Sequence, residues 1–498
     1  MASDDEYSYA YSEEEEDYQM SDDESMQFNP EAKENPNAAP VFSYAKKPGI
    51  QMLPADQVFP EMKRKLVDAT EVLGIPEVAA VVLMREFHWQ KDVLLETFFR
   101  DPDGLLKKNG VYHRVNPKPA LNSPHCAICY DDVEEKMAMP CGHEFCMDCW
   151  HDFCANAIQE EGPICVCTSC PDASCDEIVT EEEVTKAAPD HLPKFRTYQL
   201  RSFVESNKLT RWCPGAGCER VATAQSASAM EQDDNVAHCD CEGCQTSFCM
   251  KCGEEPHSPT DCPALALWNE KCRNESETAN WILANTKSCP KCVSRIEKNH
   301  GCNHMTCQKC RHEFCWICMG DWTDHGANTG GYYKCNKYDV DTGTSSGDDL
   351  SDAARAKREL DRYLHYYKRF HAHAEAQKFA RKQLKETENR MVLLQESSDD
   401  VKWSDVEFLK TANEQLVECR RVLKYSYVYA YYLKPQFEMQ KQRFEHHQEM
   451  LERFTETLSE LSEKPLAEMD RTDVVNKTRV VDQFMKNILK YVADGMDD

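Results

Sequence analysis

The sequence predicts a multidomain, mainly α-helical protein that also carries small α+β modules rich in cysteine. Three observations support this prediction. The chain has 498 residues, which is enough for about three or four domains of ordinary size. Of its 28 cysteines, 27 lie between Cys126 and Cys335, many of them in C-x2-C pairs. The segments on both sides of this region instead repeat apolar residues at helical spacing.

Charge and hydropathy exclude several classes of protein. Because 87 Asp and Glu face only 58 Lys and Arg, the formal net charge is −29, and we expect no nucleic-acid partner. No apolar run approaches the roughly 18 residues of a membrane-spanning helix, so we expect no membrane partner either. The acidic N-terminus is unlike a secretory signal. We therefore expect a protein of the cytoplasm, the nucleus or both, where cysteines stay reduced.

Residues 1–54 are expected to form a disordered acidic segment. The first 36 residues contain 13 acidic residues and a single lysine, so they offer too little apolar surface to offset the entropy lost on ordering. This segment can act as a solubilising tail or as a docking tail for a basic partner.

Residues 55–113 are predicted to form a small helical domain. Leu66, Ala69, Val72 and Leu73 have helical spacing, and Gly74 and Pro76 end that helix. Three short helices around one core resemble a ubiquitin-associated-like domain. Such a domain can be a plain packing bundle, or it can bind ubiquitin or a ubiquitin-like protein.

The C-terminal part of the chain, residues 352–498, is predicted to be a bundle of four amphipathic helices. A polar linker at residues 339–351 precedes it. The aromatic run from Tyr425 to Tyr432 is interpreted as part of the bundle core.

In a reducing compartment, the repeated C-x2-C spacing is typical of zinc sites. We predict three modules with two structural zinc ions each, at residues 122–178, 209–264 and 287–338, joined by helical linkers at 179–208 and 265–286. Alternating ligand pairs in the first module predict the cross-brace of a RING domain. Its ligands are expected to be Cys126, Cys129, Cys146 and Cys149 for one ion, and Cys141, His143, Cys170 and Cys175 for the other. Cys165 and Cys167 compete for the last two positions.

The other two modules supply the remaining ligands. Those of the second are expected to be Cys213, Cys218, Cys241, Cys244, Cys249, Cys252, His257 and Cys262. Cys239 is an alternative to Cys241. Those of the third are expected to be Cys289, Cys292, Cys307, Cys310, Cys315, Cys318, His325 and Cys335. In total, 21 cysteines and three histidines would bind six zinc ions.

One cysteine of the third module, Cys302, is left over when its eight ligands are assigned to two zinc ions. It follows Gly301 on a turn between two ligand pairs, and His304 lies two residues further on. A nearby histidine can stabilise a thiolate or act as a general base. Cys302 is therefore a candidate nucleophile, and the alternative is a spare or substitute zinc ligand.

The order of the three modules resembles the RING-between-RING ubiquitin ligases, with a RING, an in-between-RING module and a second RING-like module. The segments Asn280–Lys287, Gly301–Met305 and Glu313–Trp316, together with the helical C-terminus, are similar to the Ariadne subfamily. The resemblance covers about residues 57–498.

This resemblance implies a cysteine-dependent E3 ubiquitin ligase. The first RING would recruit a ubiquitin-conjugating enzyme, with Ile128 at a position that contacts it. Ubiquitin would pass to Cys302 as a thioester and then to a lysine of a substrate protein. His304 matches the histidine that deprotonates the incoming amine, and Glu313 matches an acidic residue that supports it.

The resemblance also implies regulation. The C-terminal helical domain would fold back on the second RING-like module and inhibit it, with Phe379 in the inhibitory contact. The acidic residue expected after it is Ala380 here, which would weaken the contact. Because relatives bind neddylated cullins through the ubiquitin-associated-like domain, a neddylated cullin complex is a further expected partner.

Two other functions are compatible with parts of the sequence. One is a scaffold ligase whose first RING only activates the conjugating enzyme, without a covalent intermediate. The other is a zinc-stabilised adaptor or nucleic-acid-binding protein, against which the negative charge argues. The unpartnered Cys302 beside His304 favours the covalent mechanism, because a scaffold needs no such thiol.

Overall fold

The computed structural model describes residues 49–226, 238–274, 286–298, 301–325, 335, 352–397, 407–433, 438–464 and 468–496. All of them belong to one compact unit, Val41–Asp498. The predicted disordered segment up to residue 48, the predicted linker 339–351 and most of the motif at residues 280–287 lie outside the described residues. Within this unit the structure is mainly helical with small cysteine-rich modules, as predicted.

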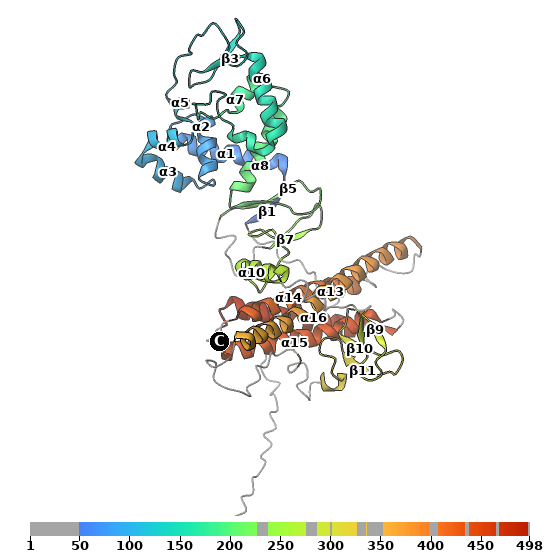
Figure 1. The fold of residues 1–498 in the computed structure, drawn as a ribbon. Helices are drawn as coiled ribbons and strands as arrows, with labels where there is room; N and C mark the ends of the chain where they lie inside the picture. The colour runs from blue at the N-terminus through green and yellow to red at the C-terminus, as the bar shows by residue number, and fades with distance from the viewer. Residues whose placement is uncertain are drawn as a thin grey trace, which may run out of the picture. The chain divides into compact units, whose positions relative to one another are not determined.

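Five helices follow one another after residue 54, where the sequence predicted three (Figure 1). They are α1 (Ala55–Leu73), α2 (Glu77–Glu86), α3 (Lys91–Arg100), α4 (Pro102–Lys108) and α5 (Tyr112–Val115). Three of the four predicted residues of α1, Leu66, Ala69 and Leu73, are buried, whereas Val72 is 47% exposed because it lies on another face than Leu73. The helix is followed by Gly74, whose φ of 67° suits glycine. The last two helices are too short to show a hydrophobic period, which is why the pattern did not predict them.

Residues 50–54 correct the prediction that the first 54 residues are disordered. They form strand β1 (Ile50–Pro54), which pairs antiparallel with β5 (Arg220–Ala224). Strand β4 (Thr210–Trp212) pairs with β5 on its other side, so that the sheet order is β1-β5-β4. A five-residue segment gains a partner about 170 residues away, and a local reading of composition cannot detect such pairing.

The first cysteine module contains the hairpin β2 (Lys136–Ala138) and β3 (Glu144–Cys146), followed by α6 (Met147–Asn156). A π-helical turn and a 3-10 turn continue it to Cys167. The next helices, α7 (Glu181–Ala187) and α8 (Leu192–Ser206), lie in the predicted linker. A buried Arg114 forms an ion pair with Glu183 at 2.7 Å and so ties α5 to the start of α7.

The second and third modules are built from short antiparallel hairpins. In the second, β6 (His238–Asp240) pairs with β7 (Ser247–Cys249), and α10 (Cys262–Asn274) follows. In the third, β8 (Thr286–Ser288) pairs with β9 (Arg295–Glu297), and β10 (His304–Thr306) pairs with β11 (Glu313–Cys315). A 3-10 turn then covers Trp322–His325. Strands of three residues are too short to stand alone, so these hairpins depend on the cysteine clusters beside them.

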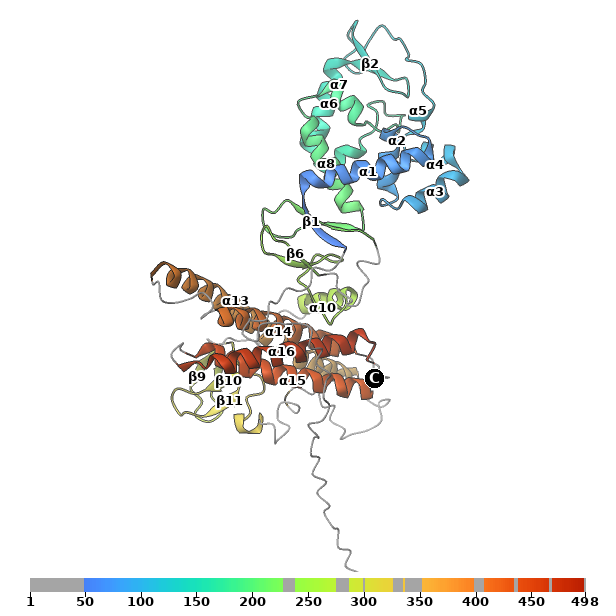
Figure 2. The ribbon, with the colours of Figure 1, turned by 180° about the vertical axis from the view of Figure 1, so that it is seen from behind.

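Four long helices complete the described chain: α13 (Asp352–Ser397), α14 (Glu407–Tyr432), α15 (Glu438–Glu463) and α16 (Arg471–Ala493). Figures 1 and 2 show them lying along one another. The central helix is α14, which is buried on nearly every face. Tyr425, Tyr427 and Tyr431 are buried in its core, as predicted for the aromatic run. Among the described residues, none of the helices has the length and apolar character needed to cross a membrane.

Candidate metal centres and thiol site

Cysteine and histidine side chains gather into compact groups of four, with ligand atoms within 4.8 Å of one another. In the first module these groups are Cys126, Cys129, Cys146 and Cys149, and Cys141, His143, Cys170 and Cys175. The pairs alternate along the chain, which is the cross-brace that the spacing predicted. Cys170 and Cys175, rather than Cys165 and Cys167, complete the second group.

The second module repeats this arrangement without crossing its pairs. Its groups are Cys213, Cys218, Cys241 and Cys244, and Cys249, Cys252, His257 and Cys262. Cys241 takes the position that Cys239 could have filled, and Cys239 instead lies in strand β6, opposite Phe248 of β7. Four sulfur or nitrogen atoms at this spacing match the tetrahedral coordination of zinc.

The third module contains one further group, Cys289, Cys292, Cys307 and Cys310. Four other predicted ligands also meet: the Sγ atom of Cys318 lies 3.3 Å from Nε2 of His325, and it interacts with the thiols of Cys315 and Cys335. Cys302 belongs to none of the other five groups of four, two in each of the first two modules and one in the third.

Backbone carbonyl groups orient two of the histidines. Nδ1 of His257 lies 2.6 Å from the carbonyl oxygen of Thr260, and Nδ1 of His325 lies 2.9 Å from that of Asp321. In both rings Nε2 is therefore the atom left for a metal ion, and the second contact sets the tautomer. His143 is different, because its Nδ1 faces the sulfur atoms of its group.

Cys302 is buried, with 7% of its surface exposed. The backbone amide of His304 donates a hydrogen bond to its Sγ atom at 3.3 Å. Arg420 also favours the thiolate, but burial and Glu456 outweigh it. Burial, followed by the carboxylate of Glu456, raises the pKa of the Cys302 thiol well above its ordinary value. In this arrangement the candidate nucleophile is enclosed, and its surroundings favour the protonated thiol.

His304 and Glu313 lie on paired strands beside this thiol. Nε2 of His304 is 3.2 Å from Oε2 of Glu313, across the β10–β11 hairpin. The imidazole stacks on Trp322 with ring centres 4.2 Å apart, and Trp322 stacks in turn on His325. The ring is thus held between a carboxylate and an indole, next to a candidate metal centre.

The residues that enclose Cys302 could not be predicted from the sequence. Glu456 of α15 accepts hydrogen bonds from the backbone amide and the side-chain amide of Asn303, at 2.8 and 2.9 Å. Arg420 of α14 donates to the same carboxylate at 2.6 Å. Although burial disfavours the charged form, the attraction of Arg420 lowers the pKa of Glu456 to about 2. A single sequence carries no local signal for a contact across 153 residues.

Phe379 of α13 packs against the turn that carries the thiol. A Cβ atom added to Gly301 would lie 2.9 Å from a ring carbon of Phe379. A glycine is therefore required here for close approach. The next residue, Ala380, is buried and brings no carboxylate to the contact, whereas Glu456 supplies one from another helix.

Ile128, the predicted contact for a conjugating enzyme, is 43% exposed in the first module. Two further apolar side chains of this module, Tyr130 and Ile164, are 80% and 69% exposed. Large exposed apolar side chains in a small module are typical of a protein interaction surface.

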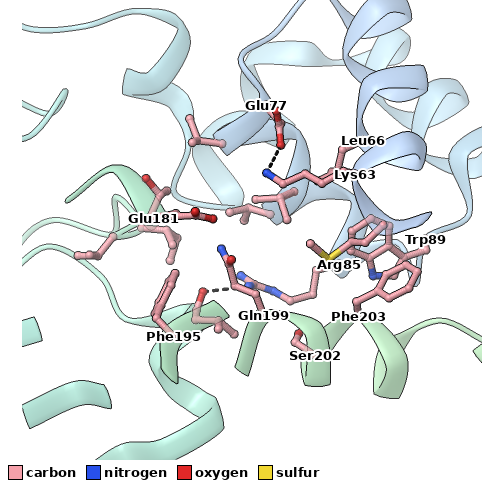
Figure 3. Close-up of a pocket in the computed structure, with 18 residues that line it drawn as sticks. Lys63, Leu66, Glu77, Arg85, Trp89, Glu181, Phe195, Gln199, Ser202 and Phe203 are labelled. Atoms are coloured by element: carbon pink, nitrogen blue, oxygen red, sulfur yellow. Dashed lines mark hydrogen bonds and ion pairs between the residues drawn. The ribbon is translucent and has the colours of Figure 1, made fainter. Parts of the chain in front are cut away.

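A separate cavity of about 50 Å³ lies between the N-terminal helices and α8 (Figure 3). Lys63 and Glu77 form an ion pair at its edge, and Arg85 donates to the carbonyl of Val166 at 2.9 Å. Gln199 extends into it from α8. A cavity of this size holds a few water molecules and no larger ligand, so we assign it to the packing between these elements.

Family models match three parts of the chain. A model described as the IBR domain, a half RING-finger domain, matches residues 193–262, and a further IBR domain model matches residues 284–331. The model of the Ariadne domain matches residues 361–494. The matches thus cover most of the second and third cysteine modules and of the helical bundle.

Curated proteins are similar to the chain over most of its length. It is 37% identical over 426 residues to E3 ubiquitin-protein ligase dbl4 of Schizosaccharomyces pombe, covering 85% of this chain and 81% of that protein. It is 34% identical over 465 residues to E3 ubiquitin-protein ligase ariadne-1 of Drosophila melanogaster, covering 90% and 89%. It is also 34% identical over 470 residues to E3 ubiquitin-protein ligase arih1 of Xenopus laevis, covering 90% and 84%.

Proposed function

Because this chain belongs to the Ariadne family of RING-between-RING E3 ubiquitin-protein ligases, we propose that it transfers ubiquitin through a thioester on Cys302. As an E3 ligase it acts with a ubiquitin-conjugating enzyme, ubiquitin and a substrate protein. One observation carries the proposal: Cys302 lies outside the five compact ligand groups and directly beside the His304–Glu313 pair.

The first step exchanges one thioester for another. The thiolate of Cys302 attacks the carbonyl carbon at the ubiquitin C-terminus, a new C–S bond forms, and the thiolate of the conjugating enzyme leaves. In the second step a substrate amine attacks that carbonyl, a C–N bond forms, and Cys302 leaves as a thiolate. The amine proton passes to His304. Because Nε2 faces Glu313 at 3.2 Å, Nδ1 is the atom that accepts the proton, and Glu313 stabilises the imidazolium.

We further propose that the bundle inhibits the first step, the transfer of ubiquitin to Cys302. Glu456 and Phe379 lie over the turn at Gly301 and Cys302, where a conjugating enzyme would have to bring its thioester. The raised pKa of the thiol adds a chemical barrier to the steric one, since the thiol is a much weaker nucleophile than the thiolate. Separation of the bundle from the third module is therefore required before transfer.

Single-turnover transfer from a ubiquitin-charged conjugating enzyme tests this mechanism on a non-reducing gel. The full chain and its Glu456→Ala variant are each combined with Cys302→Ala, Cys302→Ser or Cys167→Ala. Cys167 is an exposed cysteine outside the proposed ligand set, so it serves as the matched control. We expect a thiol-sensitive adduct that is lost in Cys302→Ala, becomes a thiol-resistant ester in Cys302→Ser, and persists in Cys167→Ala.

The Glu456→Ala background tests the inhibition separately. We expect the adduct to form at least tenfold faster there. Discharge of ubiquitin onto lysine that persists in Cys302→Ala, with no adduct in any background, would replace the covalent mechanism by the scaffold mechanism. An adduct that forms equally fast with and without Glu456 would remove the inhibitory role of the bundle.

We assign the conjugating enzyme to the first module, around Ile128. The exposure of Ile128, Tyr130 and Ile164 supports this assignment. Ile128→Ala should slow adduct formation at least tenfold while the alkylation rate of Cys302 stays unchanged. Equal slowing of both reactions would indicate a folding defect instead.

We also propose that six zinc ions hold the three modules and that none touches the reacting carbonyl. The six sets of four candidate ligands support this number. Metal analysis of the purified chain should give six zinc ions per molecule, and four or fewer would overturn the assignment. Since all 28 cysteines are free of disulfides, we place the protein in the reducing cytoplasm or nucleus, which cell fractionation tests.

The ubiquitin-associated-like interpretation of α1–α5 remains a proposal, together with activation by a neddylated cullin. The short, closely packed helices around Leu66 and Leu83 support it. Transfer rates with and without a neddylated cullin complex provide the test, and equal rates would remove the idea.

A further inference from the structure

Lys298 belongs to the polar cluster around Cys302, and it comes from the same module as the thiol. Its Nζ atom donates a hydrogen bond to Oδ1 of Asn303 at 2.8 Å. The amide groups of Asn303 donate in turn to Glu456. The charge of Lys298 also interacts with Cys302 itself and with Arg420. One ammonium group, one guanidinium, one carboxylate and one thiol thus share this small space.

The cluster divides by element into two halves. Arg420 of α14 and Glu456 of α15 form a buried ion pair at 2.6 Å within the bundle. Lys298 and Cys302 belong to the third module. When the bundle separates from the module, the opposite charges of Arg420 and Glu456 leave together. Lys298 then stays beside the thiol, together with the His304–Glu313 pair of the same module.

The hydrogen bond between Lys298 and Asn303 keeps this cation in place. It joins the two ends of a six-residue segment that contains Cys302, so the ammonium group moves with the thiol and not with the bundle. Lys298 and Glu456 bind different atoms of Asn303, since the carboxylate accepts from its nitrogens whereas Lys298 donates to its amide oxygen.

We propose that Lys298 is a positioning residue of the transfer reaction, which stabilises the thiolate of Cys302 once the bundle has moved away. This inference rests on the proposed function of Cys302. The physical reason is that a cation near a thiol favours its charged form, while Glu456 opposes it in the closed arrangement. In the closed arrangement, the contact with Glu456 that inhibits the enzyme would therefore also cancel the effect of the positive charge of Lys298 on the thiol.

Other charged groups near the cluster must be separated from this effect. Those on the bundle are His371 of α13, Arg420 of α14, and Glu452, Glu456 and Glu463 of α15, and they leave with it. The His304–Glu313 pair and the thiol of Cys315 belong to the third module and stay near the cluster. These three groups are the same in every variant compared below, so a change on removing Lys298 reports the effect of its charge on the thiol.

The test is the pH profile of Cys302 alkylation by iodoacetamide in the zinc-loaded full chain. Mass spectrometry of the peptide that contains Cys302 gives the rate between about pH 6 and pH 10. The reagent reacts only with the thiolate and only when the bundle has moved away. The plateau rate at high pH thus reports how often the module opens, and the midpoint of the profile reports the ionisation of the thiol.

Lys298→Met should raise the midpoint by about one pH unit and slow alkylation at pH 7 by about tenfold relative to the plateau. Lys298→Arg should restore the original midpoint. Because arginine stays charged over this range, that rescue also excludes the titration of Lys298 itself as the cause. Lys291→Met removes one positive charge from an exposed position of the same module and should leave the midpoint unchanged.

A purely structural role would change the plateau and leave the midpoint in place. An unchanged midpoint in Lys298→Met, or an equal shift in Lys298→Met and Lys298→Arg, would overturn the proposal. Alkylation needs no ubiquitin. A shifted midpoint without any ubiquitin adduct would therefore contradict the proposed function alone and would leave the pairing of Lys298 with the thiol standing.

Discussion

Glu456 lies over the turn that carries Cys302 and, after burial, contributes most to the raised pKa of its thiol, although it is more than 150 residues away in the chain. Its carboxylate accepts two hydrogen bonds from Asn303 and one from Arg420, all in a buried site. A buried ion pair of this kind contributes little net stability when both partners are present. We expect its effect to be on specificity, because the hydrogen bonds from Asn303 to Glu456 hold the third module against α15 in one arrangement.

Replacing Glu456 by glutamine should open this contact. The substituted side chain keeps the shape of glutamate but loses its charge, which leaves Arg420 buried without its carboxylate and costs about 3 kcal/mol or more. We expect alkylation of Cys302 to accelerate by at least tenfold in Glu456→Gln. Glu460→Gln, at an exposed glutamate one turn further along α15, is the matched control and should react like the unmodified chain. Equal rates in all three proteins would mean that Glu456 does not hold the module.

At the scale of elements, β1 joins the N-terminal helices to the second cysteine module. It runs directly into α1, while its five residues pair with β5. Ile50 and Met52 turn toward the module and pack against its core, whereas Gln51 is exposed between them. This alternation is that of a strand with one buried face.

Met52→Asp should therefore detach β1. A charge placed against an apolar core costs more than the pairing of a five-residue strand contributes, so the amides of β5 should lose protection from hydrogen exchange. Gln51→Asp introduces the same charge on the exposed face and is the control. Protection of β5 that persists in Met52→Asp, as measured by exchange and mass spectrometry, would contradict this role.

At the scale of the whole molecule, Glu255 joins the second module to the bundle. Its carboxylate pairs with Lys424 of α14 and Arg381 of α13, and Gln377 donates to it at 2.9 Å. Although burial disfavours its charge, the attraction of Lys424 lowers the pKa of Glu255 to about 2. Nearby, Thr260 donates to the backbone carbonyl of Tyr425 at 2.7 Å, so the contact continues to the edge of a candidate metal group.

Glu255→Gln should destabilise this junction by about 1–3 kcal/mol near neutral pH, seen as faster hydrogen exchange around Thr260. The folded-state pKa is depressed, so the stabilisation is present above the ordinary pKa of about 4.5 and is lost as pH falls toward 2. The difference between the two proteins should therefore shrink below pH 4.5. Glu254→Gln, at an exposed neighbour, should show no difference at any pH.

Removal of zinc should affect the cysteine modules and the helical bundle differently. The three cysteine modules depend on short hairpins and ligand groups, whereas the bundle core is made of apolar side chains from four long helices. A chelator should therefore release zinc and expose the thiols of the modules while most of the helical circular dichroism remains. Loss of the helical signal in parallel with zinc release would show that the bundle depends on the modules.

The sequence by itself determined what depends on local spacing. Ligand pairs separated by two residues, the odd position of Cys302 and the helical stripes of the C-terminal part all follow from neighbours along the chain. The grouping of Cys170, Cys175 and Cys241 in the structure agrees with the preferences drawn from spacing.

Tertiary structure decided what depends on pairing between distant segments. The strand at residues 50–54, the carboxylate of Glu456 over the thiol and the junction at Glu255 each join parts of the chain that are more than 100 residues apart. Such contacts leave no period or motif in one sequence, because either partner alone is an ordinary polar or apolar residue. The sequence could thus single out Cys302 as a candidate nucleophile, whereas its enclosure by the bundle required the fold.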